Sequence, residues 1–456
     1  MAKLFGTDGI RGPAGEFPLD AATVRVLGSS LVAHLRERLD DGPPLIVIGR
    51  DTRESGVWIE QAFIEGASRA GAQCKSAGVI TTPGVAFLAR ALPADVGVVI
   101  SASHNAYQDN GVKIFSPSGR KLEDAIERLI EADIIRATGQ PEPSTGQSVT
   151  FVRDEGEVSR LRARYINFLA DEIAQGLSLS HLTMVIDCAN GAAATIAPEL
   201  FARLGAKVIA INNHPDGRNI NLNCGSLHIE GLQQRVLDEH ADLGVAFDGD
   251  ADRALFVDAK GSFVDGDATM WALARHSHSR GELRHGLVIA TVMSNIGLEI
   301  ALRSLGVRLV RQDVGDKYVL EELLRTGATM GGEQSGHLMF PDLGLAGDGL
   351  ITTLCLLRAM DGGNKQVHEL TAGFERYPQI LVNVRVTEKR PFEEMDEVRS
   401  LAREIELQLG DRGRLLLRYS GTEPLARVMI EGENQTVIEG FANSLAAAIK
   451  GAIGSS

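Results

Sequence analysis

Cysteine is scarce in this chain, with four in 456 residues. The cysteines lie far apart and form no C-x-x-C pair: Cys74, Cys188, Cys224 and Cys355. Disulfide frameworks and zinc sites need cysteines in dense sets or close pairs. We therefore expect neither, and we expect a reducing, cytoplasmic compartment.

Long apolar runs are missing as well. No stretch approaches the ~18 apolar residues of a membrane helix. The opening sequence MAKLFGTDGIRG has a lysine but no apolar stretch behind it. The sequence thus predicts no membrane span and no secretory signal.

Positive charge is in deficit. The 46 lysines and arginines stand against 60 aspartates and glutamates, which gives a formal net charge of −14. Non-specific binding of nucleic acid or of an anionic membrane needs a positive face, so we expect neither partner. A local cluster of arginine and lysine still suffices for a small anionic substrate.

Nucleotide-binding signatures are absent too. No G-x-x-x-x-G-K-[ST] sequence occurs, so a P-loop is excluded. The G-x-G spacing of Gly347 and Gly349 has Thr352 where a dinucleotide fingerprint needs a third glycine.

The chain instead repeats one pattern. An apolar run, a polar or glycine-bearing loop, a stretch of helix length and a second turn-plus-strand recur three times, which indicates βαβ units. The apolar runs begin at Leu45, Met184 and Leu287, and the second strands follow Ala70, Leu204 and Leu305. Residues 137–150 are predicted to form a linker, with a weaker break at 361–366.

The C-terminal stretch has a different pattern. We expect a strand at 380–386, a helix at 391–409, two strands within 414–431 and a helix at 436–453. These elements predict a small α+β domain.

Three carboxylates stand at alternate positions in Asp248-Gly-Asp250-Ala-Asp252-Arg253, between two apolar runs. They repel one another unless a cation lies among them, and Mg²⁺ prefers oxygen ligands. An EF-hand is excluded, because its sixth and twelfth positions hold Arg253 and Ala259. A solvated acidic turn is the other interpretation.

A serine loop, Ser101-Ala-Ser103-His-Asn105, follows the apolar run 97–100. The carboxyl end of a parallel strand is where open α/β sheets place their ligands. The serine loop does not match the G-x-S-x-G pattern of a nucleophile elbow, and this disfavours a serine hydrolase. Alternatively Ser103 or Asn105 only caps the next segment. Lys113 follows close behind.

Three more loops combine glycine with polar groups. Residues 331–337, GGEQSGH, carry groups that hydrogen-bond sugar hydroxyls, although any polar turn has this composition. Residues 418–427, RYSGTEPLAR, place two arginines around hydroxyls and a glycine, which suits a phosphate or forms a salt-bridged hairpin. Residues 5–12, FGTDGIRG, contain Arg11, an anion contact or a surface charge.

Together these loops resemble those of the α-D-phosphohexomutase family. FGTDGIRG, SASHN with DNGVK, DGDADR, GGEQSGH and RYSGTEPLARVMIEG occur in the family's order across almost the whole chain. The resemblance implies three tandem similar α/β domains with mixed or parallel sheets plus a small α+β C-terminal domain, around a central cleft. The expected domains are 1–150 with a phosphoserine loop, 151–256 with a metal-binding loop, 257–370 with a sugar-binding loop and 371–456 with a phosphate-binding loop.

The resemblance also implies roles for the first two loops. Ser103 would be a phosphoserine that donates and recovers the phosphoryl group. One Mg²⁺ per chain would be held by Asp248, Asp250, Asp252 and a phosphate oxygen on Ser103. Arg253 would contact that phosphate.

Further roles follow by similarity. Lys113 and His337 are the candidates for moving the proton of the sugar hydroxyl, with Arg11 as electrostatic support because arginine stays protonated. Glu333 and Ser335 would hold the sugar hydroxyls. The phosphate that does not react would be held by Arg418, Ser420, Gly421, Thr422 and Arg427.

The implied activity is that of an isomerase, an intramolecular phosphotransferase. Through a hexosamine 1,6-bisphosphate intermediate, which also serves as activator, it would convert glucosamine 6-phosphate to glucosamine 1-phosphate and supply UDP-N-acetylglucosamine synthesis. The partner is a small sugar phosphate, and the resemblance allows a homodimer. Ala106 stands where the family usually has proline, which puts the stiffness of that loop in doubt.

Two other functions stay open from the sequence. A phosphoglucomutase or phosphomannomutase of the same family differs in details of GEQSGH and FGTDGIRG. A metal-dependent sugar-phosphate binder without turnover would have no reason to carry a phosphate on Ser103.

Overall fold

The computed structural model describes residues 3–6, 8–37, 42–138, 151–421 and 423–454. They form two compact units, one of Met1–Val292 with Val310–Ala372 and one of Met293–Leu309 with Gly373–Ser456. Most of the expected linker, residues 139–150, lies outside the described residues. Within the described part of the chain, no helix is long and apolar enough to cross a membrane.

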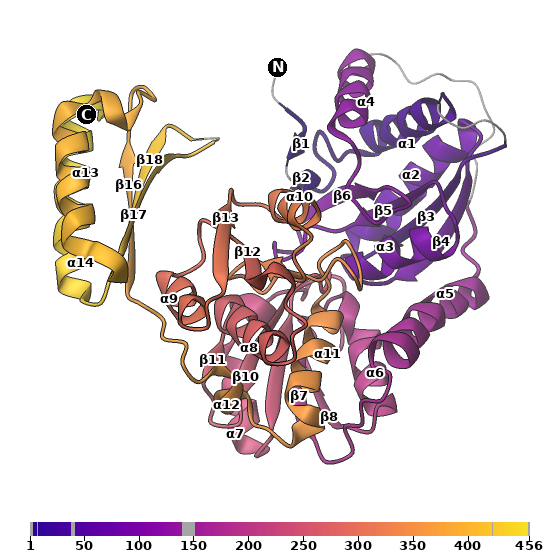
Figure 1. Cartoon of the computed structure of the whole chain (residues 1–456). Helices are drawn as coiled ribbons and strands as arrows, with labels where there is room; N and C mark the ends of the chain where they lie inside the picture. The colour runs from indigo at the N-terminus through magenta and orange to yellow at the C-terminus, as the bar shows by residue number, and fades with distance from the viewer. Residues whose placement is uncertain (1–2, 7, 38–41, 139–150, 422, 455–456) are drawn as a thin grey trace. The chain divides into compact units, whose positions relative to one another are not determined.

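The first sheet of the first unit has six strands in the order β1-β2-β6-β5-β3-β4. The strands β4, β3 and β5 run parallel, whereas β6, β2 and β1 add antiparallel edges. Four helices accompany it (Figure 1). The bounds are β1 Phe5–Gly6, β2 Gly9–Pro13, β3 Leu45–Arg50, β4 Gln73–Val79, β5 Val96–Ile100, β6 Asp109–Phe115, α1 Ala21–Arg36, α2 Ser55–Arg69, α3 Thr82–Ala91 and α4 Asp124–Ala137.

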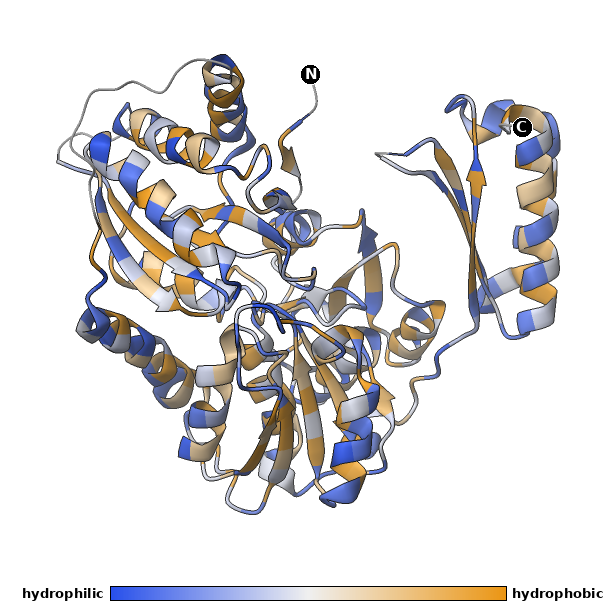
Figure 2. Ribbon diagram, turned by 180° about the vertical axis from the view of Figure 1, so that it is seen from behind, coloured by the Kyte–Doolittle hydropathy of each residue, from blue (hydrophilic) through white to orange (hydrophobic). Residues whose placement is uncertain are grey.

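The second sheet has five strands in the order β11-β10-β9-β7-β8, with β10 and β11 antiparallel. Its strands β9 and β10 are buried along their whole length, as apolar runs in a covered sheet should be. Figure 2 shows this sheet as largely hydrophobic. The bounds are α5 Glu155–Asn167, β7 Thr183–Asp187, α6 Ala197–Arg203, β8 Lys207–Ile211, α7 Glu230–Asp238, β9 Leu243–Phe247, β10 Ala254–Asp258 and β11 Phe263–Val264.

The third sheet has the order β13-β12-β14-β15. Strand β14 is short because its two residues are glycines, which leave strand pairing weak. The bounds are α8 Gly266–Ser279, β12 Leu287–Thr291, α9 Ile296–Ser304, β13 Arg308–Gln312, α10 Asp316–Thr326, β14 Gly331–Gly332, β15 Leu338–Met339, α11 Gly349–Ala359 and α12 Val367–Thr371.

The second unit contains an antiparallel sheet in the order β16-β18-β17. Helices α13 and α14 lie against one face of this sheet (Figure 1). Their apolar residues share one core with β18, which includes Val428, Ile430, Leu445 and Ile449. The bounds are β16 Gln379–Arg385, α13 Asp396–Leu409, β17 Arg414–Tyr419, β18 Leu425–Glu431 and α14 Gln435–Ile453.

The predicted fold class is confirmed: tandem α/β domains with mixed sheets precede an α+β domain. One element differs from the sequence prediction. The helix expected from residue 391 begins at Asp396, because Phe392–Glu394 form a separate 3-10 turn and Met395 is extended. The four domain boundaries stay a prediction.

Candidate functional site

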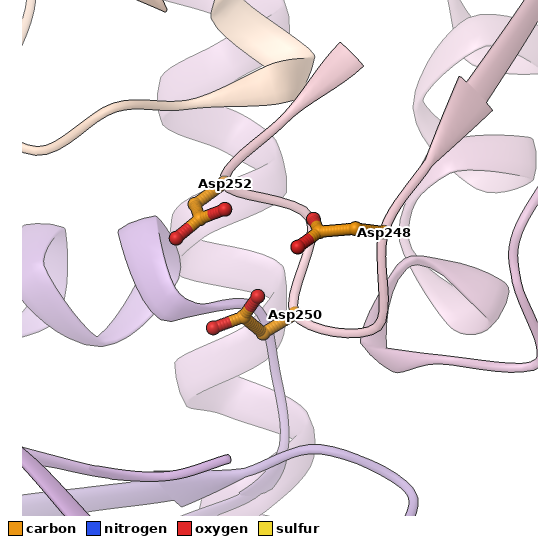
Figure 3. A group of neighbouring side chains, drawn as sticks. All are labelled: Asp248, Asp250 and Asp252. Atoms are coloured by element: carbon orange, nitrogen blue, oxygen red, sulfur yellow. The ribbon is translucent and has the colours of Figure 1, made fainter. Parts of the chain in front are cut away.

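The acidic loop joins the buried antiparallel strands β9 and β10. A left-handed turn at Ala251, with φ of 56°, brings alternate side chains to one side. The carboxylate oxygens of Asp248, Asp250 and Asp252 lie within 4.8 Å of one another, and all three residues are buried. Figure 3 shows the three carboxylates gathered around one common space.

The three carboxylates of this loop are buried close together and repel one another. Burial, and then the neighbouring charges of Asp252 and Asp250, raise the pKa of Asp248 well above its usual range. Among the described residues, Oδ1 of Asp250 and Oδ1 of Asp252 are buried without a hydrogen-bond partner. Buried oxygens of this kind, with excess negative charge, fit a hard divalent cation such as Mg²⁺. The residues present therefore fit the expected metal.

Ser103 follows β5 directly and contacts this loop. Its Oγ donates to Oδ2 of Asp248 over 2.6 Å, and only 1% of the residue is exposed. Its backbone is left-handed, with φ of 53°, and its amide donates to Oγ of Ser101 over 2.9 Å. The hydroxyl is thus held against the acidic loop.

Lys113, on β6, is the buried cation of the site. Its Nζ lies 2.8 Å from Oδ2 of Asp250, 3.1 Å from Oδ2 of Asp8 and 3.4 Å from Oδ2 of Asp252. Burial would lower the pKa of Lys113, but Asp250, Asp8 and Asp252 raise it well above its usual range. The ammonium group is therefore charged at neutral pH and is a proton donor in this state.

His337 is the second candidate for proton transfer. Its Nδ1 lies 3.6 Å from Oδ1 of Asp252, and its Nε2 lies 3.9 Å from Oδ2 of Asp316. Burial works against its charge, but Asp252 and then Asp316 raise the pKa of His337 to about 9. A Cβ on Gly347 would lie 2.1 Å from its Nε2, so the imidazole packs against bare backbone.

Two arginines complete the charged cluster. Nε of Arg253 lies 3.8 Å from Oδ1 of Asp252. Arg11, on β2, pairs with Asp8. Burial, and then the positive charges of Arg253 and Arg11, lower the pKa of His104 to about 4, so this imidazole is neutral at neutral pH.

Asp8 and Lys121 also belong to this cluster, although the sequence did not predict them. Nζ of Lys121 lies 2.8 Å from Oδ1 of Asp8 and 2.7 Å from Oδ1 of Asp316. Burial alone would raise the pKa of Asp8, but Lys113, Lys121 and Arg11 hold it far below its usual range. Its place beside Arg11 in FGTDGIRG was the available signal, whereas Lys121 and Asp316 had none.

Hydrogen bonds within the predicted sugar loop and to neighbouring segments hold it in place. Oε1 of Glu333 accepts from the amide of Gly315 over 3.2 Å, and Oγ of Ser335 donates to Oε2 of Glu333 over 3.3 Å. The carbonyl of Gln334 accepts from the amide of Gly266 over 3.0 Å. Both predicted residues stay partly exposed, so their polar groups are available to a ligand.

A cavity of about 360 Å³ is lined by Lys113 and His337. It is within the usual size range of small-molecule sites, from ~300 Å³ upward. Its charged lining includes Asp8, Lys113, Lys121, Asp252, Asp316 and His337. The first unit therefore offers a charged space for a small polar ligand.

The predicted phosphate loop belongs to the second unit, between β17 and β18. Arg418 and Arg427 stand directly opposite each other on the two strands. Like charges in such a pair are unfavourable unless an anion lies between them. Nε of Arg427 is buried without a hydrogen-bond partner among the described residues, while its Nη2 donates to Glu423 over 3.2 Å.

The turn of that loop is open. Among the described residues other than its chain neighbours, none has an atom within 4 Å of a Cβ built on Gly421. Ser420 is buried, with its Oγ 3.3 Å from the amide of Glu423. Thr422, also predicted here, lies outside the described residues. The geometry suits an anion held by two guanidinium groups.

Four sequence families match the chain in order. They are described as phosphoglucomutase/phosphomannomutase alpha/beta/alpha domain I at residues 2–140, domain II at 163–261, domain III at 265–377 and the C-terminal domain at 381–448. Every predicted site residue lies within one of these matches.

Curated relatives match over the full length. A phosphoglucosamine mutase of Solibacter usitatus is 49% identical over 100% of both chains. One of Koribacter versatilis is 46% identical over 100% of this chain and 98% of its own.

Solved structures share the fold. A phosphoglucomutase/phosphomannomutase family protein of Burkholderia thailandensis has a TM-score of 0.79 at 24% identity, over 99% of this chain and 97% of its own. An N-acetylphosphoglucosamine mutase of Aspergillus fumigatus, solved with GlcNAc-6P and magnesium, has a TM-score of 0.64 at 19% identity, over 99% and 96%.

Proposed function

This chain belongs to the phosphoglucomutase/phosphomannomutase family, and we propose that it interconverts glucosamine 6-phosphate and glucosamine 1-phosphate. The relatives that are nearly half identical over the full length carry the name phosphoglucosamine mutase. The observation that carries the proposal is the contact of Ser103 Oγ with Asp248 in a buried acidic loop.

Ser103 is the phosphoryl carrier in this proposal. The bond between phosphorus and Oγ of phospho-Ser103 breaks as O1 of glucosamine 6-phosphate bonds to the same phosphorus, which gives a 1,6-bisphosphate. The 6-phosphoryl group then returns to Oγ of Ser103, and O6 receives a proton. The product is glucosamine 1-phosphate, and the carrier is restored.

Asp248, Asp250 and Asp252, with a phosphate oxygen on Ser103, are the proposed ligands of one Mg²⁺. When bound, the ion supplies positive charge against the phosphoryl oxygens and offsets the repulsion within the triad. The guanidinium of Arg253 binds the same phosphate. Burial keeps water away from phospho-Ser103.

Lys113 and His337 are the proposed proton carriers. The neighbouring carboxylates raise the pKa values of both groups, so each starts as a cation that can give a proton to O6 or to Oγ. The group that takes the proton from O1 must be in its neutral form. This favours His337 over Lys113, because the pKa of His337, about 9, is closer to neutral pH than that of Lys113. Arg11 adds positive charge.

The remaining contacts hold the substrate. Glu333 and Ser335 bind sugar hydroxyls, and the loop with Arg418, Ser420, Gly421, Thr422 and Arg427 binds the phosphate that does not react. The domain boundaries at 150, 256 and 370, a cytoplasmic location and a homodimer belong to the same proposal.

Two measurements test the function together. A coupled assay compares glucosamine, glucose and mannose 6-phosphates, and intact-mass analysis detects a phosphate on Ser103. We expect preference for glucosamine 6-phosphate and one added phosphate that Ser103→Ala abolishes. Preference for mannose would overturn the substrate, and a chain that never takes phosphate on Ser103 would overturn the mutase mechanism.

A further inference from the structure

Two side chains outside the acidic loop bind the backbone of the serine loop. Nη2 of Arg53 donates to the carbonyl oxygens of Ser103 over 3.2 Å and Asn105 over 2.5 Å. Nδ2 of Asn221 donates to the same two oxygens over 2.9 Å and 3.0 Å. A carbonyl oxygen has two lone pairs, so the two donors together use both lone pairs of each carbonyl oxygen.

The two donors come from distant parts of the chain. Arg53 follows β3 in the first sheet, whereas Asn221 follows β8 in the second. Arg53 is completely buried and is held by Asp51, which also accepts from the Arg53 amide over 2.9 Å. A buried, fixed guanidinium is a rigid support, because its planar fork is held in one orientation.

The same carbonyl also meets the acidic loop. A Cβ on Gly249 would lie 2.5 Å from the Ser103 carbonyl oxygen and 3.0 Å from Nδ2 of Asn221. The serine loop and the acidic loop are therefore in backbone contact at this point. The left-handed turn at Ser103, unusual for a residue with a side chain, is fixed where its carbonyl is bound.

We propose that Arg53 and Asn221 are positioning residues that hold the carbonyls of Ser103 and Asn105 and thereby aim Oγ of Ser103 at the acidic loop. The inference rests on the proposed function of Ser103 as phosphoryl carrier. Both side chains are buried, and their hydrogen bonds to the serine loop engage protein backbone, so neither is expected to touch the sugar phosphate. Their loss should slow phosphoryl transfer and leave substrate affinity unchanged.

The test uses the full chain with glucose 1,6-bisphosphate as phosphoryl donor. Intact mass follows the rate and the final amount of phosphate taken up by Ser103, and a coupled assay gives kcat and KM. For Asn221→Ala we expect a rate and a kcat lower by about 10- to 100-fold, since a displacement of about 1 Å costs this much. KM should stay within about 2-fold, and the final uptake should reach one phosphate per chain.

Arg53→Lys is the second variant. It keeps a positive charge beside Asp51 but has one ammonium group in place of the fork, so both carbonyls lose a donor. We expect the same separation of kcat from KM. Thr52→Val is the matched control, because Oγ1 of Thr52 donates to the Asn190 carbonyl over 2.6 Å and not to a carbonyl of the serine loop. Its uptake rate should equal that of the wild type.

The measured rate and final uptake distinguish a loss of positioning from a loss of folded protein. A wild-type rate in Asn221→Ala overturns the proposal, and so does a final uptake that falls in proportion to the rate, because that result means fewer folded molecules. A wild-type chain that takes up no phosphate on Ser103 removes the proposed function and this inference with it. Slow but complete uptake in both variants supports it.

Discussion

The chain has two regions that we propose to bind anions, and their charged side chains are arranged in opposite ways. In the first unit, the Lys113 side chain is 2% exposed and lies among three carboxylates. In the second unit, the Arg427 side chain is 27% exposed and faces another arginine. The first region sets a buried cation against several carboxylates, whereas the second sets two arginines opposite each other, with Glu423 beside Arg427.

This difference separates two tasks. Buried, preoriented charges stabilise charge that moves during a reaction, because no solvent has to rearrange. Partly exposed arginines gain and release an anion easily, and salt screens them. Changes in the first region should therefore reduce kcat, and changes in the second should raise KM.

Ser103→Ala should abolish the reaction that we propose for the first region. Without a carrier, turnover should fall by about 10⁴-fold or more, as for other enzymes that lose their nucleophile. The coupled assay and intact mass measure activity and phosphate uptake. Ser116→Ala, at a partly exposed serine after β6, is the control and should behave as wild type. Normal turnover in Ser103→Ala would remove the carrier role.

Asp248→Asn tests the charge balance of the first region. We expect kcat to fall by about 10³-fold, a loss comparable to removing a key electrostatic group. Without Mg²⁺ the variant should melt at a higher temperature than wild type, because a buried, repelled carboxylate is gone. Saturating Mg²⁺ should raise the melting temperature of wild type but not that of Asp248→Asn.

Asp258→Asn is the matched control for that experiment. Asp258 is also buried on the same hairpin, but its Oδ1 accepts from the amides of Lys260 and Ser262. It should keep the Mg²⁺ response. If Asp248→Asn kept it too, the triad would not be the metal site.

Arg427→Ala tests the second region. Removing one of two facing guanidinium groups should raise KM about 10- to 100-fold, because a hydrogen bond to a charged group contributes about 1.5–3 kcal/mol. The kcat should stay within about 3-fold. Added salt should weaken wild-type binding as well. Arg412→Ala removes an exposed arginine of the same unit that pairs with Glu433, and should change nothing. A drop in kcat at constant KM would contradict the division of tasks.

The sequence predicted the fold class and the acidic loop for a shared reason. Apolar runs determine strands locally, and Asp248, Asp250 and Asp252 are neighbours along the chain. The surroundings of Lys113 could not be predicted, because Asp8 and Asp250 reach it from distant segments. The raised pKa values follow from those contacts and from burial, which a sequence does not contain.

The positioning residues were missed for the same reason. Arg53 stands 50 positions before Ser103 along the chain, and Asn221 stands 118 after it. Neither residue type marks a role by itself. Only the fold brings both to the same two carbonyl oxygens.

The smallest expected effect concerns a buried acid that is not among the proposed catalytic or binding residues. Asp348 caps α11 by accepting from the amides of Leu350 and Ile351, and Tyr165 donates to it over 2.6 Å. Burial raises the pKa of Asp348 to about 6, against the hydrogen bonds from Tyr165 and the two amides. Between about pH 4 and pH 6, Asp348 is therefore protonated in the folded state and ionised in the unfolded state. The free energy of unfolding falls as pH rises through this window.

Asp348→Asn should remove that fall, because asparagine keeps the cap without the charge. At pH 7.5 the variant should be more stable than wild type by about 1–3 kcal/mol, from a shift of about two units at ~1.4 kcal/mol each, and at pH 4 the two should be equal. Urea unfolding followed by tryptophan fluorescence reports on the first unit, since Trp58 and Trp271 both lie there. Asn434→Asp, at the exposed cap of α14 in the second unit, should show no such penalty, since water solvates its charge. A stability difference between Asp348→Asn and wild type that does not change with pH would mean that burial of charge does not distinguish the two units.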